Sequence, residues 1–124
     1  MTLDLKNFKY FTSPNGFTIM VGKNSIANEL LTFQIANAYD IWLHTSDVPG
    51  AHVILINPVK LCINQDDIKY AAQLAINNSQ IDKTKKKHLV DVCNAIDVSK
   101  KKYTKMGLVE IKNQYQVEIK NNIK

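Results

Sequence analysis

The segment 40–57, which reads DIWLHTSDVPGAHVILIN, constrains the fold of this chain more than any other part of the sequence. Two β-prone runs flank the sequence Asp47-Val48-Pro49-Gly50, where Pro and Gly favour a turn. The segment therefore predicts a β-hairpin. Its second strand, over residues 51–56, is almost uniformly apolar, which is typical of a central strand that is covered on both faces of a sheet.

The predicted hairpin also concentrates polar and aromatic side chains. Side chains alternate between the two faces of a strand, so Ile41 and Leu43 share one face while Trp42 and His44 share the other. The segment holds the only tryptophan and two of the three histidines of the chain. The predicted hairpin is thus a rigid element that holds four potential contact residues close together: Trp42, His44, Ser46 and His52.

The remaining sequence predicts hairpins and single helices. Turn signals between apolar runs predict the hairpins, and apolar residues at helical spacing predict the helices. This order favours an α+β domain, with a mostly antiparallel sheet built from hairpins and two main helices. The expected elements are a hairpin over 8–21 around Ser13-Pro14-Asn15-Gly16, a helix over 26–38 capped by Ser25, a helix over 66–78 capped by Asn64 or Asp66, a strand over 88–98, and a last hairpin that pairs 109–111 with 115–119.

Length and composition predict a single globular domain over residues 1–124. Hydrophobic residues make up 45% of the chain, but no apolar run approaches the ~20 residues that a membrane span needs. The N-terminus lacks the features of a signal or transit peptide, so we expect a cytosolic protein with no membrane partner. Cys62 and Cys93 lie in apolar surroundings and are expected to be reduced and buried, with a disulfide between them as the alternative.

Basic charge gathers in the second half of the chain. The 16 basic residues are all lysines, and the net charge is +5. Residues 1–62 carry four lysines and four acids, whereas residues 63–124 carry twelve lysines and seven acids. A basic pole favours polyanionic partners, with nucleic acid ahead of an anionic membrane surface. In the alternative interpretation, part of the lysine excess reflects an AT-rich coding sequence.

Three lysine-containing segments are candidates for contact with phosphate. Gly22-Lys23-Asn24 leads from a predicted strand into a predicted helix, where backbone N–H groups and Lys23 form an anion site. The alternative there is an ordinary capped turn. Residues 100–105 combine lysines with Tyr103, which offers a stacking face. Residues 83–87 are also lysine-rich, but solvated loop charge is the favoured interpretation for them.

The hairpin residues have functional and structural interpretations. On a nucleic-acid surface, Trp42 stacks on a base, and His44 and His52 contact phosphate or base. In the structural alternative, Trp42 is a core residue and local hydrogen bonds satisfy the histidines. A metal site that includes Asp40 and His44 is disfavoured, because the two lie about 13 Å apart along an ideal strand. Catalysis is disfavoured too, since no paired carboxylates or activated cysteine stand out, and no cofactor is expected.

Five motifs follow one another along the chain: Gly22-Lys23-Asn24, Asn28-Glu29-Leu30-Leu31, Asp40-Ile41-Trp42-Leu43-His44, Pro49-Gly50-Ala51-His52-Val53-Ile54-Leu55, and Ala71-Ala72-Gln73-Leu74-Ala75 with Ser79 after it. Together they resemble the NFACT-R domain, the RNA-binding module at the C-terminal end of ribosome-quality-control NFACT proteins. The resemblance covers residues 9–119. It implies an α+β fold and contact with RNA, with tRNA and ribosome-bound complexes as family partners. Two departures are Ala51, where the family often has Ser, and Met106-Gly107, where it often has Pro-Gly.

The resulting hypothesis is a stand-alone RNA-binding module, related to ribosome-associated quality control, that contacts tRNA or ribosome-associated RNA through a basic surface. The alternative is a protein-interaction module that docks on a ribosomal or other assembly without RNA affinity of its own. A third interpretation is an enzyme that acts on RNA, with His44 and His52 as acid and base. The residues expected to contact nucleic acid are Lys23, Asn24, Trp42, His44, Ser46, His52, Lys100, Lys101, Lys102, Tyr103 and Lys105.

Overall fold

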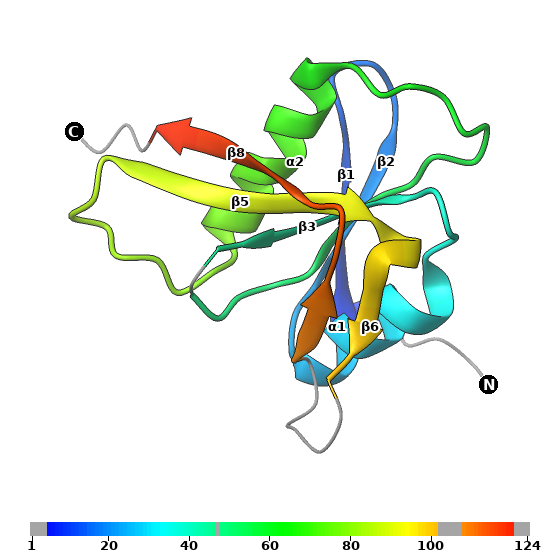
Figure 1. Cartoon of the computed structure of the whole chain (residues 1–124), viewed down its shortest axis with the longest axis horizontal. Helices are drawn as coiled ribbons and strands as arrows, with labels where there is room; N and C mark the ends of the chain where they lie inside the picture. The colour runs from blue at the N-terminus through cyan, green and yellow to red at the C-terminus, as the bar shows by residue number, and fades with distance from the viewer. Residues whose placement is uncertain (1–4, 47, 102–107, 121–124) are drawn as a thin grey trace.

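An antiparallel sheet forms the centre of the domain (Figure 1). The computed structural model describes residues 5–46, 48–101 and 108–120. Six strands follow one another in the order β1-β2-β4-β3-β5-β8, and β6 and β7 form a separate ribbon. With its two α-helices, this arrangement confirms the predicted α+β class. The elements are β1 (Phe8–Thr12), β2 (Thr18–Gly22), α1 (Ser25–Leu30) with its π-helical continuation η2 (Leu31–Ile35), β3 (Ile41–Thr45), β4 (Val53–Leu55), α2 (Gln65–Asn77), β5 (Lys87–Asn94), β6 (Val98–Lys100), β7 (Val109–Ile111) and β8 (Tyr115–Lys120).

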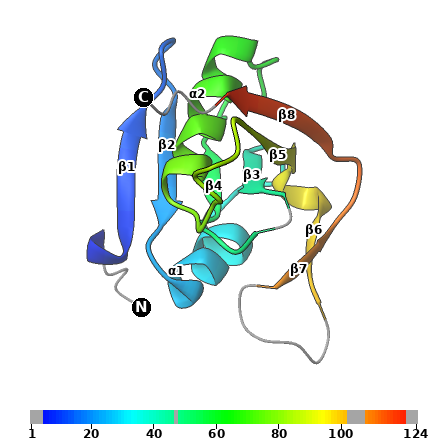
Figure 2. The same cartoon turned by 90° about the vertical axis from the view of Figure 1, so that its left-hand side faces the viewer.

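Helix α2 covers one face of the sheet (Figure 2). Its buried side carries Ala71, Ala72 and Ala75, none of which has exposed surface. Leu43 and Leu55 belong to the same core cluster. Small side chains let a helix approach a sheet closely, as the alanine-rich motif predicts.

The opposite face of the sheet is covered by α1, η2 and β6. Leu31, Trp42 and Ile54 lie in this second core, and Val98 of β6 joins them. Neighbouring residues of β3 therefore point to opposite cores, since Leu43 packs with α2 while Trp42 packs with α1. The predicted alternation along β3 is confirmed, and so is the central place of β4, which lies between β2 and β3.

The first helix begins and ends at different residues from those predicted. The Asn24 side chain accepts a hydrogen bond from the Ala27 N–H at 2.8 Å, so Asn24 is the N-cap and Ser25 is the first helical residue. The helix then continues as the wider π-helix η2 and ends at Ala36, whose backbone is extended. None of the helices in the described ranges is long and apolar enough to cross a membrane.

The C-terminal part of the chain forms one long, bent hairpin. Strand β5 pairs with β8, from Lys87 opposite Lys120 to Val92 opposite Tyr115. The 3-10 turn Ala95–Asp97 ends β5 and redirects the chain, so that β6 pairs with β7 in a ribbon of its own (Figure 2). The predicted pairing of residues 109–111 with 115–119 is therefore wrong, because each of these strands pairs with the earlier arm of the long hairpin.

The two cysteines are free, as predicted, but only one of them is buried. Cys62 is exposed in the connection between β4 and α2, so the prediction of its burial is wrong. Burial raises the pKa of the Cys93 thiol to about 12, with further contributions from Asp97 and Asp91. Cys93 is therefore a protonated, unreactive core residue at neutral pH.

Candidate functional site

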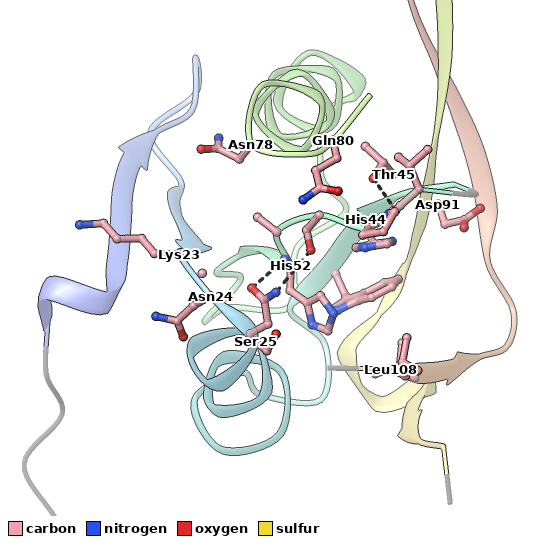
Figure 3. A pocket seen from close by; sticks show the side chains of 18 of the residues that line it. Lys23, Asn24, Ser25, His44, Thr45, His52, Asn78, Gln80, Asp91 and Leu108 are labelled. Carbon is pink, nitrogen blue, oxygen red and sulfur yellow. Dashed lines mark hydrogen bonds between the residues drawn. The ribbon is translucent and has the colours of Figure 1, made fainter. Parts of the chain in front are cut away.

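A pocket of about 610 Å³ opens where β2 and β3 end and β4 begins (Figure 3). Its walls come from parts of the chain that are far apart in sequence. They are residues 22–25 with Asn28, the end of β3, residues 48–52, Asn78 and Gln80 after α2, Asp91 of β5, and Leu108, Val109 and Ile111 around β7.

Three rings from the predicted hairpin cluster in the wall of this pocket. The rings of Trp42 and His44 stack, with centroids 5.8 Å apart and 18° between their planes. His52 meets both rings edge-on, at 5.3 Å from Trp42 and 5.5 Å from His44. Trp42 is 1% exposed and His52 is 2% exposed, whereas His44 is only partly buried. His44 is thus the ring that a ligand reaches most readily.

Thr32 of η2 joins two of these rings through its hydroxyl group. The Trp42 indole N–H donates to Thr32 Oγ1 at 3.2 Å, and the same oxygen lies 2.7 Å from His52 Nδ1. A hydroxyl that accepts from the indole can donate its own hydrogen to Nδ1, which fits a neutral imidazole protonated on Nε2. Sequence reasoning missed Thr32, because only the packing of η2 on the sheet brings it to the rings.

Asn28 of α1 fixes the backbone around His52. Its Oδ1 accepts from the His52 N–H at 3.0 Å, and its Nδ2 donates to the Gly50 carbonyl at 3.3 Å. The His52 carbonyl in turn accepts from the Gly22 N–H at 3.1 Å. A Cβ on Gly22 would lie 2.2 Å from Asn28 Oδ1, so the absence of a side chain at Gly22 makes this close approach possible.

The loop between β3 and β4 is also held from the side of α2. The Ala51 N–H donates to the Asn78 carbonyl at 3.2 Å, and the Gln80 N–H donates to the Pro49 carbonyl at 3.1 Å. The loop is therefore anchored on α1 through Asn28 and on the chain that follows α2. Residues 48–52, which form this wall of the pocket, are therefore held by hydrogen bonds from both sides, unlike an isolated hairpin turn.

His44 has a perturbed titration. Burial lowers the pKa of His44 below its ordinary value of 6.5, while Asp91 and hydrogen bonds with the Thr45 and Gly50 backbone oppose the shift without reversing it. Asp91 is the cross-strand partner of His44 on β5. His44 is therefore neutral at pH 7, with one ring nitrogen as a donor and the other as an acceptor. Sequence reasoning missed Asp91, because only the pairing of β3 with β5 brings it here.

Five of the predicted contact residues line the pocket, whereas Ser46, Lys100 and Lys101 lie outside its lining. Ser46 lies outside the pocket lining, and its Oγ accepts from the Gln116 side chain at 3.2 Å. The five predicted residues in the lining are Lys23, Asn24, Trp42, His44 and His52.

The predicted lysine patch on the C-terminal ribbon is only partly described. Lys100 forms an ion pair with Glu29 at 2.5 Å, and its ammonium group lies 5.4 Å from the centre of the Phe33 ring. Lys101 is exposed just beyond β6. The other three predicted members, Lys102, Tyr103 and Lys105, lie outside the described residues.

Trp42, His52 and Asp40 make contacts that stabilise the fold. Trp42 matches the structural alternative, because its side chain is in the core and His44 covers one face of the ring. His52 is buried too, with its Nδ1 beside Thr32. The Asp40 carboxylate accepts from the Asn37 and Asn57 backbone N–H groups at 2.8 and 2.7 Å, which ties two loops together. Among the described residues, no three His, Cys, Asp or Glu side chains are grouped for a metal ion.

Comparison with known proteins identifies one protein family and several relatives of this chain. The family model of the NFACT protein RNA binding domain matches residues 7–113. The chain is 36% identical over 107 residues to the Rqc2 homolog RqcH of Bacillus subtilis (strain 168), a match that covers 86% of the chain and 18% of that protein. It is 30% identical over 114 residues to the Rqc2 homolog RqcH of Streptococcus suis (strain 05ZYH33), covering 90% of the chain and 20% of that protein.

A solved structure shares the fold. The C-terminal part of the fibronectin/fibrinogen-binding protein from Streptococcus suis (FBPS) matches with a TM-score of 0.83 and 27% identity, over 96% of this chain and 46% of that one. The chain spans about a fifth of the length of the curated relatives that it matches. Because the family model matches most of its residues, the chain belongs to the NFACT protein RNA-binding domain family.

Proposed function

We propose that this domain binds RNA in ribosome-associated quality control, with tRNA or ribosome-associated RNA as its target in the cytosol. Its family is named for RNA binding, and its curated relatives are named Rqc2 homologs. One observation carries the proposal: three motifs that are separate in sequence, at 22–24, 40–44 and 49–55, contribute to one pocket. A concave site assembled in this way, with a few polar groups in its wall, is typical of a binding surface.

Lys23 supplies positive charge at the pocket. Its side chain is exposed and extends outward from the pocket rim beside Asn24 (Figure 3), and it has no ion-pair partner among the described residues. A phosphate beside this ammonium group is attracted to it and loses a condensed counterion, so the contact makes binding depend on salt. Lys101 supplies a second charge near the pocket. Its backbone N–H donates to the backbone carbonyl of the pocket residue Leu108 at 3.4 Å, which places Lys101 next to the pocket wall.

His44 supplies hydrogen bonds at the centre of the proposed site. Its neutral ring can donate to a phosphate or base oxygen through one nitrogen and accept through the other. Trp42, Thr32 and His52 support this ring from the core side and hold its orientation. In this proposal, Trp42 acts as the support of a contact residue and not as a stacking platform.

Binding to total tRNA and to duplex DNA of equal length, measured over a salt series, tests the proposal. We expect tighter binding to RNA, with an affinity that falls as salt rises. Lys23→Ala should weaken RNA binding and reduce the salt slope by about one. The matched control is Lys69→Ala, an exposed lysine on α2 outside the pocket, which should leave the slope nearer to wild type. Equal, weak binding to both nucleic acids, unchanged by Lys23→Ala, would contradict the proposal.

Exposed apolar side chains at the opposite end of β3 favour a second candidate function, docking on a protein assembly. Tyr39, Leu61 and Ile96 are all about half exposed or more, and Lys60 lies over the Tyr39 ring. The Ile96 N–H donates to the Ala38 carbonyl, so these segments are neighbours. A pull-down from nuclease-treated lysate discriminates between the candidates, since partners that survive the removal of RNA favour docking.

A further inference from the structure

The pocket carries charges of both signs on opposite sides. Lys23 lies at one rim, from which its exposed side chain extends outward, and Asp91 lies at the opposite rim, with Gln80 and His44 between them (Figure 3). One Asp91 oxygen accepts from the Gln116 side chain at 3.1 Å, and an ionised carboxylate has acceptor capacity for further donors. A site for phosphate alone gains nothing from a carboxylate, because like charges repel. The arrangement fits a ligand that is anionic at one end and carries N–H donors at the other.

The dimensions of the pocket suit a single nucleotide better than a base-paired helix. Its volume of about 610 Å³ falls in the range of roughly 300–1,000 Å³ that is usual for small-molecule sites. Residues 48–52 wall it on one side, and Leu108 and Ile111 wall it on another. Paired RNA offers its phosphates and shallow minor groove to a protein, whereas an unpaired nucleotide can be turned out and enter a pocket.

We propose that the pocket receives the base of one unpaired nucleotide of the bound RNA, with an exocyclic amino group of the base at Asp91 and the phosphate outside the pocket, at the rim that carries Lys23. This inference rests on the proposed RNA binding and adds the class and orientation of the ligand. Carboxylates accept hydrogen bonds from exocyclic amino groups such as N4 of cytosine. Uracil has no such group and turns carbonyl oxygens toward Asp91, which repels them. Gln80 and neutral His44 each donate and accept, so they complete the contacts around the base.

Three RNAs with the same paired stem test this inference: a hairpin with a cytidine loop, a hairpin with a uridine loop, and a blunt duplex. We expect the cytidine hairpin to bind roughly tenfold more tightly than the uridine hairpin, and the duplex to bind no better than the uridine hairpin. Trp42 reports on the pocket, because it is the only tryptophan and its ring stacks on His44. Its fluorescence should change with the cytidine hairpin and stay constant with the duplex.

Asp91→Asn separates recognition of the amino group from general charge. Removal of a negative charge raises the affinity for every RNA, so the readout is the ratio of the two hairpin affinities. This ratio should fall toward one in Asp91→Asn, because Asn offers a donor as well as an acceptor. It should keep its wild-type value in Asp66→Asn, which removes an exposed carboxylate of α2 outside the pocket.

Titration of the wild-type protein with cytidine and uridine monophosphates gives a readout that requires no variant to fold. The Trp42 indole N–H resonance should shift more with the cytidine nucleotide than with the uridine nucleotide. Equal responses to the two monophosphates, equal binding of the two hairpins, or a preference that survives Asp91→Asn overturns the nucleotide pocket and leaves RNA binding intact. Absence of binding to every RNA overturns both the pocket and the proposed function.

Discussion

Gly50 approaches Ser79 so closely that a Cβ on Gly50 would lie 1.9 Å from the Ser79 Oγ. The two backbones form an isolated antiparallel bridge at this point, and the Ser79 Oγ donates to the Ala75 carbonyl. The turn that leads into His52 is therefore seated directly on the end of α2. The Pro-Gly sequence supplies the turn, but the bridge to Ser79 determines where the turn lies relative to the pocket.

Gly50→Ala should destabilise the domain by about 1–3 kcal/mol, because overpacking forces the backbone apart. Urea unfolding measures this loss. The double variant with Ser79→Gly should recover part of it, since the Ser79 Oγ and Cβ are the two nearest atoms to the new methyl group. Ser79→Gly alone completes the double-mutant cycle. Strictly additive effects of the two substitutions would show that the close approach does not matter for stability.

Thr32→Val should cost about 1–3 kcal/mol, because it leaves the Trp42 indole N–H without its acceptor in the core. Valine has nearly the same shape, so lost packing contributes little. Thermal unfolding measures the change, and a shift of the Trp42 emission should accompany it. Thr18→Val is the matched control, since Thr18 is exposed on β2. A Thr32→Val protein as stable as this control would contradict the role assigned to the hydroxyl.

His44 should make the domain sensitive to mild acid. Burial lowers its pKa below 6.5, against the opposing effect of Asp91 and of the Thr45 and Gly50 backbone. As the pH falls through 6.5, the unfolded chain takes up a proton that folded His44 resists, so the contribution of His44 to stability is fully present well above this pH and declines below it. His44→Gln should remove this part of the decline in urea unfolding between pH 7.5 and 5.

Asp91→Asn should strengthen the decline of stability in mild acid that His44→Gln removes, in the same urea unfolding measurement. Loss of the carboxylate removes an effect that raises the His44 pKa, so the folded state resists protonation more strongly. The decline of stability below pH 6.5 should therefore be steeper than in the wild type. A shallower decline would mean that Asp91 does not act on His44 in this way.

Asp67 should support the fold at neutral pH and lose this effect in strong acid. Burial alone raises its pKa, but hydrogen bonds from the Asn15 backbone and side chain and from Ser13 lower it below the ordinary 3.8. Its contribution is present above that value and disappears as the pH falls through the lower folded pKa. Asp67→Asn should therefore cost about 1–3 kcal/mol at pH 7 and less near pH 2. A cost of Asp67→Asn that is the same at pH 7 and near pH 2 would contradict this role of the carboxylate.

Glu29 should compete with RNA for Lys100. The two side chains form an ion pair on the surface, with 61% of Lys100 and 22% of Glu29 exposed. Surface pairs contribute about 0–1 kcal/mol to stability, so Glu29→Gln should unfold nearly like the wild type. If Lys100 contacts phosphate, Glu29→Gln should bind RNA more tightly, and adding Lys100→Ala should abolish the gain. An unchanged affinity in Glu29→Gln would remove Lys100 from the proposed surface.

Sequence patterns of local origin predicted much of the framework. The period of two along residues 41–45 predicted which side chains of β3 face each core, and the turn at 13–16 predicted the pairing of β1 with β2. The alanine-rich motif predicted the close packing of α2. These features depend on residues within a few positions of one another, whose spacing and turn preferences act wherever the segment lies.

Only the tertiary structure decided how the pocket is assembled. Thr32, Asn28 and Asp91 reach the hairpin because η2, α1 and β5 pack or pair with it, and no local pattern encodes such partners. The same limit explains the wrong pairing predicted for the last strands. The chain bends after β5, so β7 pairs with β6 and β8 pairs with β5. The sequence by itself determined the alternation of side chains along β3, the positions of the turns and the family. Long-range packing determined that His52 is buried, that Lys100 is paired with Glu29, and that His44 and Asp91 share one wall of the pocket.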